Sequence, residues 1–267
     1  MSKSLMAVAV FTVFSAFGAI DHPWTGKKVV FLGDSITDPN QIERRGRHLY
    51  WQFLADDCGI EPHVYAVSGY QWSNIYPMAR KMRGEMTNSV DAIMIFLGTN
   101  DYNAGVPLGE WFEIGERDVN RNGVTLRRPH RTFVRDMGTF RGRINTVLGY
   151  LKQELPDQQI VLMTPIHRGY ANFGPSNVQP PENVPNVLGL YVEDYIRVLR
   201  EAADIWSVPL IDLYRESGLL PCDPAYAKDF ADGGADGKDN LHPSTSGHRR
   251  LAKVIAGHLR TLPPDFK

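Results

Sequence analysis

Val29-Val30-Phe31-Leu32-Gly33-Asp34-Ser35 is the stretch of sequence that decides the fold of this chain. Its apolar residues are continuous rather than alternating, and a Gly-Asp-Ser turn ends the run. Such a run is typical of a strand that is buried on both faces of a parallel sheet. We therefore predict a strand over residues 28–33, with Ser35 directly after its carboxyl end.

Four more apolar runs of this kind follow, and segments with helical patterns separate them. The strands are expected at 63–67, 91–97, 159–164 and 208–212, and the helices at about 44–57, 73–84, 136–154, 186–206 and 245–260. This alternation predicts a doubly wound α/β sandwich that forms one domain over residues 21–267. Two long connections, 102–135 and 165–186, are expected to be functional loops.

Three polar motifs each follow one of the predicted strands. They are Gly33-Asp34-Ser35, Ser68-Gly69 and Gly98-Thr99-Asn100. In doubly wound sheets, ligands bind at the carboxyl ends of the strands, near the point where the strand order reverses. This common location predicts that the three motifs form one site.

A fourth motif, Asp239-Asn240-Leu241-His242, supplies a candidate acid–base pair. A serine hydroxyl becomes a good nucleophile when a base takes its proton, and a histidine oriented by a carboxylate is a common base. Among the eight histidines, only His242 has an acidic residue three positions earlier in a short polar segment. We predict that Asp239 orients His242, with Asp232 and Asp236 as alternatives. Three other histidines, expected at the surface of helices, are His48, His248 and His258.

A serine nucleophile also needs hydrogen-bond donors for the oxyanion that forms in acyl transfer. The backbone N–H of Gly69 and the side-chain amide of Asn100 are the candidates, and the backbone N–H of Ser35 would be the third. Taken alone, Gly69 also fits a tight turn and Asn100 also fits a helix cap. The combination with Ser35 and His242 favours the oxyanion hole.

Together the four motifs resemble the SGNH hydrolases, also called the GDSL esterase/lipase family. The chain has Ile36 where the name motif has leucine. The resemblance implies a flavodoxin-like three-layer α/β/α sandwich with a five-stranded parallel sheet in the order 2-1-3-4-5. It also implies Ser35 as nucleophile, His242 as base and Asp239 as its orienter. Gly69 and Asn100 would complete the oxyanion hole, and no cofactor or metal is implied.

The substrate is less well defined by the sequence. Eight arginines lie between Arg117 and Arg143, and they fit either a solvated loop or a rim that attracts an anionic glycan. Contacts with the substrate are expected from Asp34, Trp72, Tyr102, Arg128 and Arg168. Further aromatic residues in or beside the predicted loops, which could stack on sugar rings, are Trp111, Tyr170 and Phe173.

The sequence favours a serine esterase that removes an O-acetyl group from a carbohydrate. The polar loops and the lack of a long apolar lid carry this preference, which rests on analogy with exported family members. One alternative is a lipase, lysophospholipase or thioesterase that uses the same triad. Another is a non-enzymatic glycan-binding module on a hydrolase scaffold.

The first twenty residues and the net charge of the chain indicate where the protein is located and which partners it binds. Residues 1–20 predict a secretory signal peptide, because an apolar run follows Lys3 and ends in small residues. We therefore expect an exported protein, periplasmic or extracellular, without stable membrane association after cleavage. The net charge of −1 favours neither nucleic acid nor a membrane surface as partner. Cys58 and Cys222 could pair, and the sequence leaves the oligomeric state open.

Overall fold

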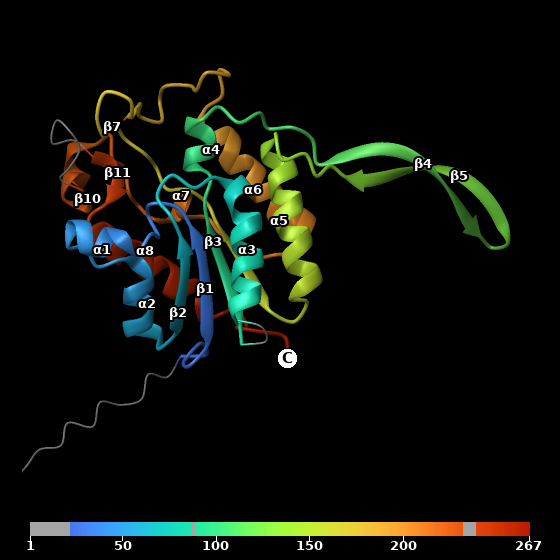
Figure 1. Ribbon diagram of the computed structural model, residues 1–267, viewed down its shortest axis with the longest axis horizontal. Coiled ribbons are helices and arrows are strands. Elements are labelled where there is room, and N and C mark those ends of the chain that lie inside the picture. Colours follow the sequence, from blue (N-terminus) through green and yellow to red (C-terminus); the bar gives the residue numbers. More distant parts are fainter. Residues whose placement is uncertain (1–21, 87–88, 232–238) are drawn as a thin grey trace, which may run out of the picture.

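The computed structural model describes residues 22–86, 89–231 and 239–267, and a five-stranded parallel sheet lies at its centre (Figure 1). The strand order is β2-β1-β3-β6-β9. The strands are β1 (Lys28–Gly33), β2 (Glu61–Ala66), β3 (Ala92–Phe96), β6 (Gln159–Met163) and β9 (Leu210–Ile211). In chain order these are the five predicted strands, so the α/β fold with the order 2-1-3-4-5 is confirmed.

Helices cover both faces of the sheet and make a three-layer sandwich (Figure 1). Helices α3 (Trp72–Met86), α5 (Phe140–Glu154) and α6 (Val192–Trp206) pack on one face, and α2 (Tyr50–Cys58) and α8 (Thr245–Leu259) pack on the other. Strand β1 serves both layers, because Val30 and Leu32 point to the first set of helices and Val29 and Phe31 to the second. Burial of each such side chain stabilises the fold by about 1.5–3 kcal/mol. This explains why the run is apolar at every position.

The predicted helix over 44–57 is confirmed from Tyr50 onward, but a separate helix occupies its first residues. Helix α1 (Asn40–Arg45) ends at Gly46, whose φ of 60° lies in the left-handed region, and α2 begins only after the extended Leu49. A left-handed glycine is a common way to end a helix. The other four predicted helices are confirmed, with ends that differ by up to six residues.

The connection 102–135 is a β-hairpin rather than a loop. After the short helix α4 (Thr99–Asn103), strands β4 (Phe112–Arg121) and β5 (Val124–Phe133) pair in antiparallel fashion. Asn122 and Gly123 join them with φ values of 55° and 82°. Asn-Gly is the preferred sequence of such a tight turn, because both residues tolerate positive φ. The Asn-Gly dipeptide therefore indicates a hairpin, although the many polar residues of the segment suggested a loop.

The connection 165–186 forms part of a second, smaller sheet with the order β10-β11-β7-β8. Its strands are β7 (Ala171–Asn172) and β8 (Val178–Gln179), and they join β11 (Asp239–Pro243) and β10 (Phe230–Ala231). Backbone bonds lock the two segments together, since Gly169 N donates to Asn240 O at 2.8 Å and Asn240 N donates to Tyr170 O at 2.9 Å. The Asp-x-x-His motif is thereby fixed to this connection. The remaining helices are α7 (Leu213–Glu216) and the 3-10 helix η1 (Pro224–Asp229), which lie between β9 and β10 in the chain.

Three expectations concern the leader, the membrane and the cysteines. The predicted signal peptide, residues 1–20, lies outside the described residues, as do Asp232 and Asp236. Within the described ranges, no helix combines the length and the apolar character that crossing a bilayer requires. Cys58 is buried in α2 and Cys222 is exposed, and both are free thiols, so the two cysteines do not pair.

Candidate active site

Ser35, His242 and Asp239 lie in direct contact at the carboxyl edge of the sheet. Ser35 follows β1, and its Oγ lies 2.8 Å from His242 Nε2. His242 Nδ1 lies 2.9 Å from Asp239 Oδ2 and 3.0 Å from Oδ1. A carboxylate only accepts hydrogen bonds, so Nδ1 carries the proton and Nε2 is left to accept from the serine. The predicted acid–base pair is thus in position to take a proton from Ser35.

The carboxylate of Asp239 is held by more than the histidine. Its Oδ1 accepts backbone hydrogen bonds from Leu241 N at 3.3 Å and His242 N at 3.0 Å. Arg47 Nη2 lies 3.8 Å from Oδ2, and both side chains are buried. No local pattern pointed to Arg47, because 192 residues separate it from Asp239 in the chain. These contacts fix the carboxylate in the orientation that aligns the imidazole.

Gly33 and Gly69 let the backbone approach the serine closely. A Cβ on Gly33 would lie 2.4 Å from Thr37 Oγ1, so only glycine fits the turn that presents Ser35. Gly69 has a φ of 86°, which favours glycine, and it lines the pocket beside Ser35. Asp38 holds this segment, because its Oδ2 accepts from both the backbone N (2.9 Å) and the Oγ (2.7 Å) of Ser68.

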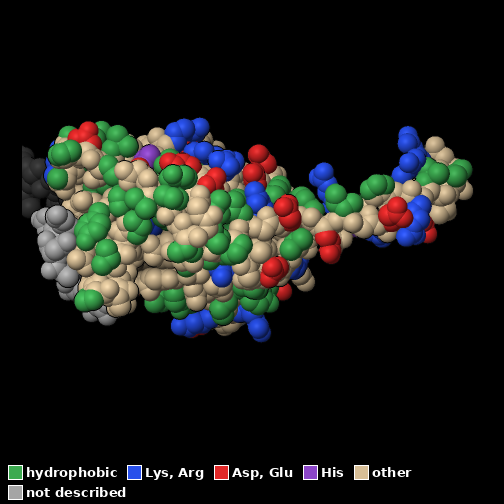
Figure 2. Space-filling view, turned by 90° about the horizontal axis from the view of Figure 1, so that it is seen from above, with side chains coloured by type: hydrophobic (Ala, Val, Ile, Leu, Met, Phe, Trp, Pro, Cys, Tyr) green, Lys and Arg blue, Asp and Glu red, His purple; other side chains and the backbone are tan. Residues whose placement is uncertain are grey.

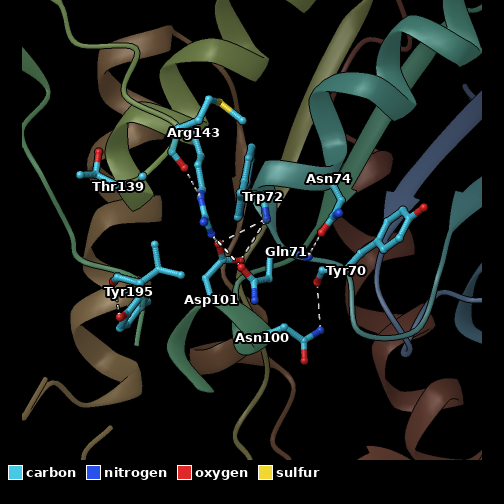
Figure 3. Close-up of polar contacts among 12 residues, drawn as sticks. Tyr70, Gln71, Trp72, Asn74, Asn100, Asp101, Thr139, Arg143 and Tyr195 are labelled. Carbon is cyan, nitrogen blue, oxygen red and sulfur yellow. Dashed lines mark hydrogen bonds and ion pairs between the residues drawn. The ribbon is translucent and has the colours of Figure 1, made fainter. Parts of the chain in front are cut away.

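Asn100 lies at the start of α4, and its side-chain amide is tied to the segment that follows Gly69 (Figure 3). Asn100 Nδ2 donates one hydrogen bond to Tyr70 O at 3.0 Å, which leaves its second hydrogen for a ligand. Gly98, with a φ of 129°, makes the sharp turn into the helix. The three predicted oxyanion donors, from Ser35, Gly69 and Asn100, therefore line one pocket.

A buried ion pair supports the Asn100 turn from behind (Figure 3). Both carboxylate oxygens of Asp101 accept from Trp72 N, at 3.3 and 3.1 Å, and Arg143 Nη1 lies 2.8 Å from Oδ1. The same arginine nitrogen donates to Gln71 Oε1 at 2.9 Å. Burial raises the pKa of Asp101 to about 6, against the opposing effect of Arg143. Two of the motifs are thus cross-linked, which fixes the spacing of Gly69 and Asn100.

The pocket at this site has a volume of about 200 Å³. Beside the residues already placed there, its polar lining comes from Gln41, Ser68, Asn177 and Gln179, and its apolar lining from Phe173 and Leu241. The ring of Phe173 meets the ring of His242 edge to face, with centroids 5.4 Å apart. Of the five aromatic residues named from the sequence as substrate contacts, only Phe173 is among the described lining residues. Asn177 and Gln179 were missed, although they lie in the long connection predicted to be functional.

The predicted contacts of Trp72 and Tyr102 with the substrate are wrong. Trp72 is 1% exposed and packs edge to face against Phe140, and Tyr102 is fully buried against Tyr195. Both rings belong to the core between the sheet and its first helical layer. Helices from later parts of the chain bury both rings. The position of Trp72 and Tyr102 beside polar motifs in the sequence therefore did not indicate exposure to the substrate.

Asp34 is also buried, at 2% exposed, and does not line the pocket. Its Oδ1 accepts from Ile36 N at 3.0 Å and so shapes the turn that carries Ser35. The prediction that Asp34 binds substrate is therefore wrong. Burial is the main cause that raises the pKa of Asp34 to about 7.

This raised pKa of Asp34 predicts a pH dependence of stability. Between about pH 4 and pH 7 the folded protein retains a proton on Asp34 that the unfolded chain has lost, so the free energy of unfolding falls as pH rises. We expect Asp34→Asn, which keeps the acceptor for Ile36 N, to flatten this slope in urea denaturation curves. The exposed Asp157→Asn is the matched control and should keep the wild-type slope. An unchanged slope in Asp34→Asn would contradict the assignment.

Arg128 lies far from the pocket, on the hairpin that leaves the body of the molecule. In Figure 1 this hairpin extends from the side opposite to β11, which carries Asp239 and His242, and Figure 2 shows it clear of the body. Arg127 on the same hairpin pairs with Glu116 at 2.7 Å. Of the two interpretations of the arginines, the rim that attracts an anionic glycan is therefore wrong, because the chain turns outward after α4.

This correction gives a testable result. We expect charge reversal at Arg127, Arg128 and Arg131 to leave kcat/KM unchanged within about twofold for both neutral and anionic esters, because exposed charges at a distance are screened by salt. Steady-state assays at 0.15 M salt check this. A selective loss on anionic esters would restore a role for the hairpin in substrate choice.

Arg168 is fully buried and contacts the pocket only through other residues. Its Nη1 donates to Thr99 Oγ1 at 2.9 Å, and its Nη2 donates to Gln179 Oε1 at 2.9 Å. Burial lowers the pKa of its guanidinium to about 10. A direct contact with substrate is excluded by this burial, so the predicted role of Arg168 is wrong in that form.

His248 was expected at the surface and is instead 1% exposed. It stacks on Tyr50, with ring centroids 6.2 Å apart, on the inner face of α8. Burial, and then the nearby Arg47 and His242, lower the pKa of His248 to about 3. The imidazole is therefore neutral beside the site, and His242 is the histidine that contacts Ser35.

Comparisons with known proteins identify the family and the fold of this chain. A sequence model described as the GDSL-like lipase/acylhydrolase family matches residues 31–250. A crystal structure of a protein from Lactobacillus plantarum is 28% identical, over 89% of this chain and 98% of that chain, with a TM-score of 0.66.

Two more distant structures share the fold. A possible lipase from Chitinophaga pinensis is 19% identical, over 88% of this chain and 98% of that chain, with a TM-score of 0.61. An acetyl xylan esterase is 21% identical, over 86% of this chain and 98% of that chain, with a TM-score of 0.52. No curated protein sequence matches the chain.

Proposed function

The chain belongs to the GDSL-like lipase/acylhydrolase family, and we propose that this serine ester hydrolase removes O-acetyl groups from a carbohydrate through an acyl-enzyme. One observation carries the proposal. The hydrogen-bonded chain from Ser35 Oγ through His242 to Asp239 opens into a small pocket, and six of its ten described lining residues carry a side-chain amide or hydroxyl. Such walls suit a polar alcohol rather than a hydrocarbon chain.

The first half of the proposed reaction forms the acyl-enzyme. His242 Nε2 takes the proton of Ser35 as Oγ attacks the carbonyl carbon of the ester. The negative charge that develops on the carbonyl oxygen is met by the backbone N–H groups of Ser35 and Gly69 and by Asn100 Nδ2. Asp239 stabilises the imidazolium. When the tetrahedral intermediate collapses, His242 returns the proton to the leaving alcohol.

The second half releases the acyl group. Water gives a proton to His242 Nε2 as its oxygen attacks the carbonyl carbon that is bonded to Ser35 Oγ. The same three donors meet the second oxyanion. Collapse breaks the bond to Ser35, the proton on His242 returns to Oγ, and acetic acid leaves and loses its proton to solvent as acetate.

The composition of the pocket favours a small acyl group. A long acyl chain gains about 0.8 kcal/mol per methylene only where it leaves water for an apolar surface. Phe173 and Leu241 are the only large apolar side chains among the described residues that line the pocket. An acyl chain longer than a few carbons would lie against amide groups or remain in solvent, and would gain little.

The test measures acetate release from a panel of acetylated polysaccharides, beside hydrolysis of p-nitrophenyl esters of increasing chain length. We expect release of acetate, and a fall in kcat/KM for esters beyond butyryl. Activity that rises with chain length would point instead to a lipase or thioesterase. If the protein hydrolyses p-nitrophenyl acetate but releases acetate from no carbohydrate, it is an esterase whose natural substrate has a different alcohol group.

A further inference from the structure

Two buried charges determine how the amide groups of the pocket wall are oriented. Arg168 lies behind Asn177 and Gln179, and Asp38 lies behind Gln41 and Ser68. Amide oxygen and nitrogen atoms look alike, so their assignment has to follow from the hydrogen-bond network. The guanidinium of Arg168 can only donate and the carboxylate of Asp38 can only accept. These two groups therefore determine which atom of each neighbouring amide is the oxygen and which is the nitrogen.

The cationic network begins at Arg168, which has no ion pair within 4.0 Å among residues 22–86, 89–231 and 239–267. A guanidinium has donors and no acceptor, so Gln179 has to present its oxygen, and Arg168 Nη2 donates to Gln179 Oε1 at 2.9 Å. The amide nitrogen of Gln179 then donates to Asn177 Oδ1 at 3.1 Å. Asn177 Nδ2 is consequently the free donor of a side chain that lines the pocket.

The anionic network fixes the neighbouring part of the wall. Asp38 Oδ2 accepts from Ser68 Oγ at 2.7 Å, which uses the only hydroxyl hydrogen of Ser68. Ser68 Oγ therefore accepts from Gln41 Nε2, at 3.1 Å. Both charges stay behind the wall, and no Lys, Arg, Asp or Glu is among the described lining residues.

We propose that Asn177 determines specificity by donating a hydrogen bond from Nδ2 to an oxygen of an uncharged, hydroxylated alcohol group. The proposal rests on the esterase function proposed above. A hydroxyl or ring oxygen of a neutral sugar can accept this bond. A carboxylate of an acidic sugar would lose part of its hydration in the pocket and would find no cation among the described lining residues to pair with, which costs free energy. Arg168 and Gln179 are positioning residues that act through Asn177.

The experiment compares two variants on two esters. Asn177→Ala removes the donor. Gln179→Glu keeps the size of the side chain but cannot donate to Asn177 Oδ1, so Asn177 turns Nδ2 toward the new carboxylate and away from the substrate. The esters are a monoacetylated methyl glycoside of a neutral sugar and p-nitrophenyl acetate, and Asn183→Ala, an exposed asparagine outside the pocket, is the matched control.

We expect both variants to lower kcat/KM for the glycoside by about tenfold, the size of one hydrogen bond, and to leave p-nitrophenyl acetate within about twofold. The double variant should lose little more than Asn177→Ala alone, because both changes remove the same donor. Wild-type protein should also prefer the neutral glycoside to its uronate counterpart. Thermal unfolding of each variant shows whether the fold is retained.

Several outcomes would overturn the proposal. Equal losses on both esters would show that Asn177 maintains the shape of the pocket rather than recognising the alcohol group. Unchanged kcat/KM for the glycoside would show that Asn177 does not bind the alcohol group. A preference for the uronate would contradict the uncharged subsite. In these three cases the wild-type protein still releases acetate from a glycoside, so the proposed function stands. Wild-type protein that cleaves p-nitrophenyl acetate but no acetylated glycoside would overturn both.

Discussion

Ser35→Ala is expected to lower kcat for p-nitrophenyl acetate by roughly 10³-fold or more, with the fold intact. The reason is that Ser35 Oγ, 2.8 Å from His242 Nε2, is the one hydroxyl in position to lose its proton to that base among the described contacts of His242. Ser89→Ala is the control, because it removes the hydroxyl of an exposed serine that does not line the pocket. A serine-reactive phosphonate should label Ser35 in the wild-type protein.

His242→Ala should cost about as much as Ser35→Ala, and the double variant should cost little more. Residues that act as a unit give strongly non-additive losses, because removal of either one abolishes the same step. Asp239→Asn should cost less than His242→Ala, since the imidazole itself remains. Activity of Ser35→Ala within tenfold of wild type, or additive losses in the double variant, would contradict the proposed nucleophile and base.

Asn100→Ala is expected to reduce kcat by roughly 10²–10³-fold with little change in KM. Its amide is held at Tyr70 O and has one hydrogen left, which bonds the oxyanion more strongly than the neutral carbonyl of the bound ester. An interaction that strengthens only in the transition state lowers kcat when it is lost.

The control for Asn100 is Asn103→Ala, at the exposed end of the same helix α4. It tests whether any change in this short helix disturbs the site, and we expect it to keep kcat within about twofold. A large rise in KM with unchanged kcat for Asn100→Ala would show ordinary substrate binding rather than stabilisation of the oxyanion.

The sequence alone determined the strands of the central sheet, and the resemblance to the GDSL esterase/lipase family implied their order. Apolar runs such as 28–33 can satisfy their burial only between two helical layers, so local composition was sufficient to identify them. Polar motifs at the ends of such runs meet at one edge of a parallel sheet, whatever the rest of the chain does. This is why Ser35, Gly69 and Asn100 could be assigned to one site before the structure was known.

Tertiary structure alone decided what surrounds those motifs. Trp72, Tyr102 and Arg168 follow or adjoin polar motifs, yet α5, α6 and the connection 165–186 bury them, and burial depends on which distant elements cover a face. The outward path of the hairpin depends in the same way on the turn after α4. No local pattern in the sequence records such packing.

The polarity of the pocket is the clearest case of this kind. Asn177 and Gln179 are ordinary loop residues in the sequence, and their amides could point either way. The guanidinium of Arg168 removes that freedom, because it can only donate to Gln179 Oε1 and thereby leaves Asn177 Nδ2 as the donor. Strand β8 brings the amides to the site and a buried charge orients them, so the fold decides what the pocket offers to a substrate.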